Sequence, residues 1–175
     1  MNYFELFNIP QSFDVDAVKL ADSYRELQRA VHPDKFANAS EQEKRLSVQK
    51  AAQINDGYQT IKTPIARAEH LLVLSGVTLA DESETMKDMS FLMQQMSWRE
   101  AMEDAEHGSD PFDAIDALYD DFSKEQAQMT KDLATALQQN NAEANQHSAM
   151  LVRKLKFMAK LVDELSRLED KLSDK

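Results

Sequence analysis

The side chains best suited to chemistry in this chain stand together in the stretch VHPDKF, residues 31–36. His32 and Asp34 could serve as a general acid and base, or as two ligands of a metal ion. Acid–base catalysis needs a pocket, however, and a segment that turns between two predicted helices is convex. A metal site needs further ligands, and neither His70 nor His107 has helical spacing to the pair. We therefore expect no catalytic residue, no metal site and no cofactor.

The amino-acid composition excludes other classes of chemistry. The 175 residues include no Cys, so thiolate catalysis, disulfides and Cys-based zinc or iron–sulfur ligation by this chain are excluded. The formal net charge is −11, and so acidic a chain should repel a nucleic-acid backbone. The charge is also uneven: residues 1–75 hold 9 Lys and Arg against 10 Asp and Glu, whereas residues 76–175 hold 11 against 21. This asymmetry suggests two modules with different partners.

Secretion and membrane insertion are not expected. The start, MNYFELFN, has no basic region and no long apolar run, and no stretch approaches the apolar length of a membrane span. We expect a soluble, cytoplasmic protein that binds neither membrane nor nucleic acid.

The elements that must position His32 and Asp34 are helices. Only 3 Gly and 4 Pro interrupt a chain rich in helix-forming residues, which predicts an all-α fold. An amphipathic helix must end at His32, because the residue before a proline is pushed out of α geometry. Its apolar stripe has helical spacing and consists of Ala17, Leu20, Tyr24, Leu27 and Val31.

A second helix follows the His-Pro-Asp segment. Ser40 and Glu43 have the spacing of a capping box, and Pro64 is suited to begin a short third helix that Gly76 closes. The apolar face of the second helix consists of Ser47, Ala51, Ile54, Tyr58 and Ile61. Two long helices joined by a short loop should lie antiparallel, with His-Pro-Asp at the tip of the hairpin.

The sequence of the second half of the chain predicts an antiparallel three-helix bundle. Its first helix covers residues 84–107, Asp110 and Pro111 begin the next, and Asn140 and Asn141 form the second turn. The predicted core of the middle helix is Ile115, Leu118, Phe122, Met129 and Leu133. The predicted core of the last helix is Leu151, Leu155, Met158, Val162 and Leu165.

The first helix of this bundle is apolar on two sides. At about 100° per residue, one face carries Phe91, Trp98, Met102 and Ala105. The nearly opposite face carries Met89, Leu92, Met93 and Met96, continued by Glu100 and Asp104. A bundle helix buries one stripe. The second face therefore either packs on the first module or forms an exposed surface for a partner, and the periodicity leaves both possibilities open.

Several motifs resemble known families. An apolar segment, a helix, His-Pro-Asp and a capped helix with Ile54-Asn55-x-x-Tyr58 resemble the J-domain of DnaJ-type co-chaperones. More narrowly, the stretches YFELFNIP, HPDKFA, RAEHLLVLSG, FLMQQM and RKLKFMAKL resemble the HscB family of iron–sulfur assembly co-chaperones. The resemblance implies a J-domain over residues 1–75, a linker over 76–83 and a C-terminal bundle over 84–175.

The resemblance also implies two partners and no enzymatic activity. A specialised DnaK-type chaperone ATPase (HscA-like) would be stimulated through His32, Pro33, Asp34, Arg25, Arg29 and Lys35. An iron–sulfur scaffold protein (IscU-like) would bind Leu92, Met93, Met96, Glu100, Asp104 and Phe157. Two alternatives stay open: a J-protein that serves unfolded clients in general, and a hydrolase or metalloprotein built on His32, Asp34 and His70.

Three positions depart from the family pattern. Val31 stands where an aromatic residue is usual, and Ser97 stands where an acidic residue is usual, which puts scaffold affinity through that spot in doubt. Gly57 stands inside a predicted helix where the pattern favours Ala, at an expected cost of up to about 1 kcal/mol of helix stability.

Overall fold

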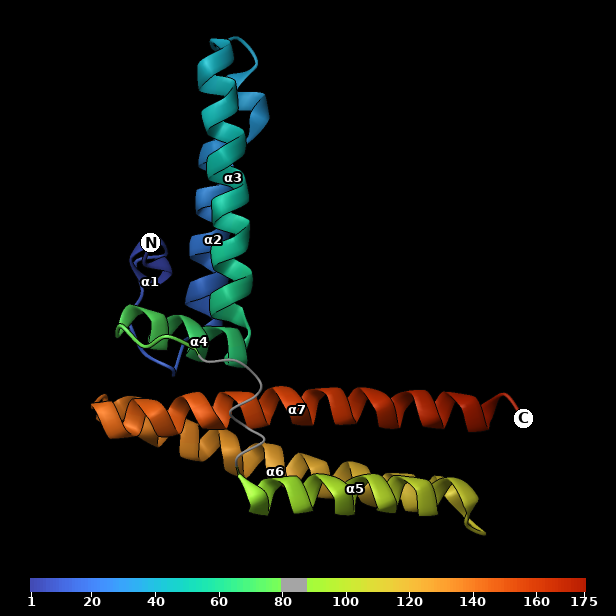
Figure 1. Cartoon of the computed structure of the whole chain (residues 1–175). Helices are drawn as coiled ribbons and strands as arrows, with labels where there is room; N and C mark the ends of the chain where they lie inside the picture. Colours follow the sequence, from blue (N-terminus) through green and yellow to red (C-terminus); the bar gives the residue numbers. More distant parts are fainter. Residues whose placement is uncertain (80–87) are drawn as a thin grey trace. The chain divides into compact units, whose positions relative to one another are not determined.

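The computed structural model describes residues 1–79 and 88–175, and these ranges contain helices, turns and loops but no strand. The prediction of an all-α fold is confirmed. The chain divides into two compact units, Met1–Val77 and Thr78–Lys175 (Figure 1). Part of the predicted linker, residues 80–83, lies outside the described ranges. Within the described ranges, no helix is both long enough and apolar enough to cross a membrane.

The first unit is built around a hairpin of two long helices. Its elements are α1 (Tyr3–Leu6), α2 (Ala17–Val31), the 3-10 helix η1 (Pro33–Phe36), α3 (Glu41–Lys62) and α4 (Pro64–Leu74). Helices α2 and α3 lie side by side and antiparallel, as predicted, and η1 lies at one end of the pair (Figure 1). Helix α2 ends at Val31 because His32 has extended backbone, with φ −60° and ψ 135°.

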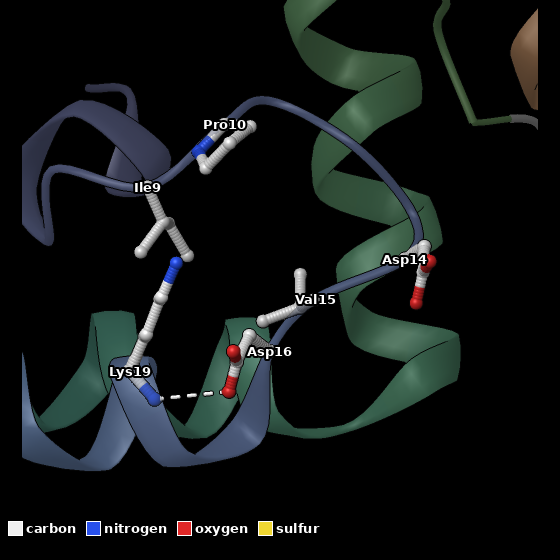
Figure 2. A pocket seen from close by; sticks show the side chains of 6 residues that line it. All are labelled: Ile9, Pro10, Asp14, Val15, Asp16 and Lys19. Carbon is white, nitrogen blue, oxygen red and sulfur yellow. Dashed lines mark hydrogen bonds between the residues drawn. The ribbon is translucent and has the colours of Figure 1, made fainter.

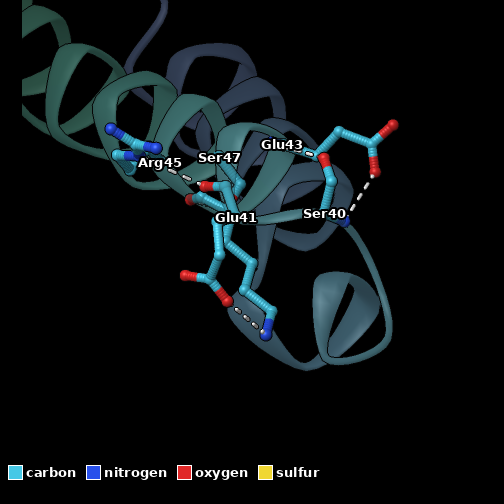
Figure 3. Close-up of polar contacts among 6 residues, drawn as sticks. Ser40, Glu41, Glu43, Arg45 and Ser47 are labelled. Atoms are coloured by element: carbon cyan, nitrogen blue, oxygen red, sulfur yellow. Dashed lines mark hydrogen bonds and ion pairs between the residues drawn. The ribbon is translucent and has the colours of Figure 1, made fainter.

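The start of α3 is fixed by the predicted capping box. The Glu43 N–H donates to Ser40 Oγ at 3.2 Å, and the Ser40 N–H donates to a Glu43 carboxylate oxygen at 3.2 Å (Figure 3). These two bonds satisfy N–H groups that have no partner inside the helix. Helix α3 therefore begins at Glu41, a short connection after η1 ends at Phe36.

Helix α1 docks on α3 through a gap that Gly57 leaves open. Phe4 and Phe7 are each only 1% exposed. A Cβ on Gly57 would lie 2.8 Å from Tyr3 Cδ1, closer than packed carbon atoms can approach, and 3.2 Å from Phe7 Cε2, which is a tight contact. Gly57 is thus required by close packing, which is the physical reason for this departure from the family pattern.

Two side chains of α4 hold the N-terminal segment. The Tyr3 N–H donates to His70 Nε2 at 3.1 Å, so His70 caps the start of α1 from another helix. The rings of Tyr3 and His70 stack with centroids 4.9 Å apart. Arg67 donates to the backbone carbonyls of Phe13 and Ile61, both at 2.7 Å, which ties the loop before α2 to the end of α3. Burial lowers the pKa of Arg67 from its ordinary value.

The second unit consists of α5 (Met89–His107), α6 (Pro111–Gln139) and α7 (Ala142–Ser173). Successive helices run antiparallel, so α5 and α7 run parallel (Figure 1). Asp110 caps α6 with Pro111 at its first position, and Asn140 adopts left-handed backbone with φ 45° at its end. The predicted core residues of α6 are all buried.

Two details of the predicted bundle are wrong. Helix α5 begins at Met89 and not at residue 84, because Asp88 has extended backbone and its side chain caps the helix by accepting from the Phe91 N–H. Residues 84–87 lie outside the described ranges. In α7, Leu161 is fully buried whereas Val162 is only half-buried, so the core stripe continues from Met158 by a step of three.

Candidate functional sites

The His-Pro-Asp tip is a short turn whose own side chains hold it. Pro33 begins η1, and the Lys35 N–H donates to the His32 carbonyl at 3.0 Å. The Asp34 N–H donates to His32 Nδ1 at 3.2 Å. An accepting Nδ1 carries no proton, so the neutral imidazole holds its proton on Nε2. His32 can therefore cap the turn with one nitrogen and offer the other as a donor.

The tip presents its polar groups to solvent. The Asp34 side chain is 92% exposed and the His32 side chain is 56% exposed. Asp34 Oδ2 lies 3.5 Å from His32 Nδ1, a pairing that becomes ionic only when the imidazole is protonated. These exposed groups are suited to bind another macromolecule, whereas catalysis would need a site that excludes water.

An open hollow of about 430 Å³ lies at the other end of α2, away from the tip (Figure 2). Its lining is Ile9, Pro10, Asp14, Val15, Asp16 and Lys19. Asp16 is already engaged as the N-cap of α2, where it accepts from the Lys19 N–H at 3.2 Å. In the described ranges, no group of three or more His, Cys, Asp or Glu side chains could hold a metal ion. The hollow includes none of His32, Asp34 and His70 in its lining, so it does not support a catalytic centre built on these three residues.

The predicted basic residues lie on the exposed side of α2 and on η1. Arg25 and Arg29 are one helical turn apart and both exposed, and Lys35 is exposed in η1. Arg25 forms an ion pair with Asp22, with both side chains mostly in solvent. An exposed pair of this kind is worth about 1 kcal/mol at most, so a partner can displace it at little cost.

The sequence reasoning missed a second source of positive charge beside the tip. Helix α3 packs against η1, so its first turns, which carry Lys44 and the exposed Arg45, lie at the same end of the hairpin as His-Pro-Asp. Lys44 pairs with Glu41 at 3.4 Å, and Arg45 donates to the Glu41 carbonyl at 3.4 Å. The antiparallel hairpin was the available signal, because it returns the first turn of α3 to the end of α2.

A polar cluster between α2 and α3 fixes the register of the hairpin and hence the position of the tip. The rings of Tyr24 and Tyr58 stack with centroids 4.1 Å apart. The Tyr24 hydroxyl donates to Asn55 Oδ1 at 2.6 Å, and the Gln28 amide donates to the same oxygen. A slip of one helix along the other would break these contacts together.

Helix α5 presents one buried face and one exposed face. Phe91, Trp98, Met102 and Ala105 are buried, as predicted. On the opposite side Met89 is 65% exposed, and Met93 and Met96 are each 67% exposed. We call these three residues the methionine face. Glu100 and Asp104 continue it and are exposed, whereas Leu92 at its edge is half-buried.

Ion pairs with α7 hold α5 in this orientation. They join Asp88 to Lys154 at 3.0 Å, Arg99 to Glu164 at 2.7 Å, and Glu106 to Lys171 at 2.6 Å. Asp88, the N-cap of α5, falls on one line along the helix with Arg99 and Glu106, between the buried face and the methionine face. The hydrogen bond from the Phe91 N–H, followed by that from Lys154, lowers the pKa of Asp88, and the hydrogen bond from Lys171 lowers the pKa of Glu106. The pairs turn the methionine face away from the bundle core.

The structure places Phe157 among core aromatics and not in the middle of the methionine face. Its ring meets Phe91 edge-on at 5.5 Å and stacks on Trp98 at 6.5 Å, between ring centroids. The Arg99 guanidinium lies 5.7 Å from its ring centroid. Phe157 is half-buried at the seam of α5 and α7, so its predicted contact with a partner would involve only its exposed edge.

Known proteins similar to this chain match it over nearly its full length. The family model described as "HSCB C-terminal oligomerisation domain" matches residues 87–166. The chain is 57% identical to the Co-chaperone protein HscB homolog of Shewanella frigidimarina and 59% identical to that of Shewanella baltica, over 99% of this chain and 100% of each relative.

Two solved structures are also similar. "Chaperone HscB from Vibrio cholerae" superposes with a TM-score of 0.92 at 44% identity, over 98% of this chain and 99% of that one. Human co-chaperone protein HscB superposes with a TM-score of 0.86 at 25% identity, over 97% of this chain and 82% of the human one. The likeness therefore extends through both units.

Proposed function

The chain belongs to the HscB family of co-chaperones, and from this premise we propose that it is a cytoplasmic co-chaperone of iron–sulfur cluster assembly. Its first unit stimulates ATP hydrolysis by a specialised DnaK-type chaperone (HscA-like). Its second unit delivers the iron–sulfur scaffold protein (IscU-like) to that chaperone. The chain itself catalyses no reaction. The observation that carries the proposal is the solvent-exposed His-Pro-Asp tip in a chain that is 57% and 59% identical to the two Shewanella HscB homologs over 99% of its length.

At the tip, recognition depends on charge and on a fixed backbone. Asp34 keeps its carboxylate in solvent and can form a charge-assisted pair with a basic residue of the chaperone. His32 supplies a donor from Nε2, and Pro33 fixes the turn between them. Arg25, Arg29 and Lys35 would meet an acidic chaperone surface and speed encounter.

In the second unit, the proposed scaffold site combines apolar and acidic groups along α5. Met93 and Met96 supply flexible apolar contact, and methionine side chains adapt to an irregular partner surface. Glu100 and Asp104 extend the site with negative charge, which suits a scaffold with basic side chains beside an apolar patch. Leu92 and Phe157 contribute from its edge.

The proposal assigns the two activities to separable modules. We place the J-domain at residues 1–75, the linker at 76–83 and the scaffold-binding bundle at 84–175. The uneven charge supports this division, because the acidic excess falls almost entirely on residues 76–175.

Two variants, each altered at one of the two proposed binding sites, test the proposal. His32→Gln should abolish stimulation of the chaperone ATPase, because it removes the imidazole of the tip, while binding to the scaffold stays at the wild-type level. Met93→Ala with Met96→Ala should weaken scaffold binding and leave ATPase stimulation by the chain alone unchanged. Stimulation that survives in His32→Gln would refute the J-domain assignment.

A second candidate is a J-protein for unfolded clients in general. Exposed methionines favour it, because such surfaces bind many sequences. Binding assays against several denatured proteins and one folded scaffold would separate the two. Equal affinity for all of them would favour the general co-chaperone, and preference for the folded scaffold would favour the proposed role.

A further inference from the structure

The methionines that the structure describes in the second unit differ widely in exposure. The sequence has nine Met and no Cys, so thioethers are its only sulfur groups. Met102, Met129 and Met158 are 9%, 8% and 0% exposed, whereas the three members of the methionine face are 65–67% exposed. Oxidants in solution reach exposed thioethers first. The solvent-accessible sulfur of α5 is therefore concentrated on the surface to which we assign scaffold binding.

We propose that Met89, Met93 and Met96 form an oxidation-sensitive switch that controls binding at the methionine face. The inference rests on the proposed function, which places the scaffold on this surface. Hydrogen peroxide is the oxidant: the thioether sulfur attacks one peroxide oxygen, the O–O bond breaks, and an S–O bond forms. The sulfur loses two electrons, and the attacked oxygen gives up its proton to the other peroxide oxygen, so the products are the sulfoxide and water. Methionine sulfoxide reductases reverse the change.

The switch acts on binding because a sulfoxide is strongly polar. A partner that covers an unmodified methionine removes apolar surface from water, which favours association. A partner that covers a sulfoxide must strip water from its oxygen, which costs free energy unless a donor replaces that water. Several sulfoxides on one small surface would add these costs at the centre of the site, where binding energy is concentrated.

The bundle itself should survive the oxidation. The methionine face lies opposite Phe91 and Trp98, which stay packed against Phe157. The ion pairs between α5 and α7 involve no sulfur and continue to hold the helix. Oxidation therefore changes the chemistry of the surface while its position stays the same.

The first unit supplies an internal control. Residues 17–36, which include α2 and the His-Pro-Asp tip, contain no Met. Peroxide should therefore leave ATPase stimulation by the chain alone unchanged while scaffold binding is lost. An oxidant that damaged the protein in general would reduce both activities.

The test compares wild type with the variant Met89→Leu, Met93→Leu, Met96→Leu before and after graded peroxide. Peptide mass spectrometry should find sulfoxide at the three face positions before Met102, Met129 and Met158. Scaffold affinity of wild type should fall about tenfold or more on oxidation and return after reductase treatment. The affinity of the leucine variant should be the same before and after peroxide. That variant keeps the other six methionines, so it reports any effect of sulfur elsewhere.

Three results would overturn the inference. They are unchanged scaffold affinity in oxidised wild type, an equal loss in the leucine variant, and oxidation of the buried methionines before the exposed ones. Failure of the proposed site would be recognised separately in unoxidised protein. If Met93→Ala with Met96→Ala then binds scaffold like wild type, the scaffold site is elsewhere, and the switch falls with it.

Discussion

At the scale of single residues, the N-terminal segment is held by positions that lie far from it in the sequence. Gly57 leaves room on α3 for the rings of Tyr3 and Phe7, and His70 accepts from the Tyr3 N–H. Each of these roles depends on a contact across the fold. Helix propensity alone predicted that Gly57 destabilises α3, since glycine is a poor helix former.

Gly57→Ala should therefore destabilise the first unit, although alanine favours helix. Displacing the packed Tyr3 ring costs about 1–3 kcal/mol, and the gain in helix propensity recovers at most about 1 kcal/mol. Amide hydrogen exchange in α3 would measure the change. In a Tyr3→Ala background the cost should shrink, because the closest contact is gone. Faster exchange by the same factor in both backgrounds would contradict the packing explanation.

His70 should make the docking of α1 depend on pH. Burial, and then the charge of the N-terminus, lowers the pKa of His70 below its ordinary value of 6.5. Since the folded pKa is the lower one, the unfolded chain binds the proton more readily. The stabilisation is complete above the unfolded pKa and is lost as pH falls from there through the folded pKa.

An NMR titration would check this sign. The His70 ring should titrate below pH 6.5, and the Tyr3 amide should lose exchange protection over the same range. His70→Gln should remove that pH-dependent step. A His70 midpoint above 6.5 would show that the charged imidazole is favoured in the folded protein, contrary to the geometry.

At the scale of elements, the helix ends that depend on neighbouring residues in the sequence could be predicted. The helix ends and helix faces that depend on contacts with distant residues could not. Pro33 fixes the end of α2, and Ser40 with Glu43 fixes the start of α3. The start of α5 depends also on the ion pair between Asp88 and Lys154, 66 positions away along the chain, so the expected start at residue 84 was wrong.

The candidate sites divide in the same way. Helical periodicity separates the methionine face from the buried face of α5, because both patterns lie within one helix. The depth of Phe157 depends on how α7 rotates against α5, which the sequence of α7 does not specify by itself. The basic residues Lys44 and Arg45 come to the same end of the hairpin as the tip only because the chain turns back there.

Phe157→Ala and Met93→Ala should differ strongly in their effects on stability. Removing the Phe157 ring empties space beside Phe91 and Trp98, at a cost of about 2 kcal/mol or more. Met93→Ala on the exposed face should change stability by less than about 0.5 kcal/mol. Urea unfolding followed by fluorescence of Trp98, the single Trp of the chain, measures both. Equal shifts of the urea midpoint in the two variants would contradict the assignment of Phe157 to the seam of α5 and α7 and of Met93 to the exposed surface.

At the scale of the whole molecule, the two proposed sites lie on different units. The tip belongs to Met1–Val77, and the methionine face belongs to Thr78–Lys175. Each surface is held by interactions within its own unit: the Tyr24–Asn55 cluster for the tip, and the ion pairs with α7 for α5. A substitution at one site should therefore leave the other intact. An adaptor nevertheless requires both sites on one chain.

A mixing experiment tests this requirement most directly. His32→Gln lacks a working tip, and Met93→Ala with Met96→Ala lacks a working scaffold face. Scaffold-dependent stimulation of the chaperone ATPase would be measured in single turnover, with wild type, with each variant alone, and with the two variants mixed at limiting concentration. We predict that the mixture stays near the level of the better single variant, because neither chain can bring the scaffold to the chaperone. Recovery of the wild-type rate by the mixture would contradict the two-ended adaptor.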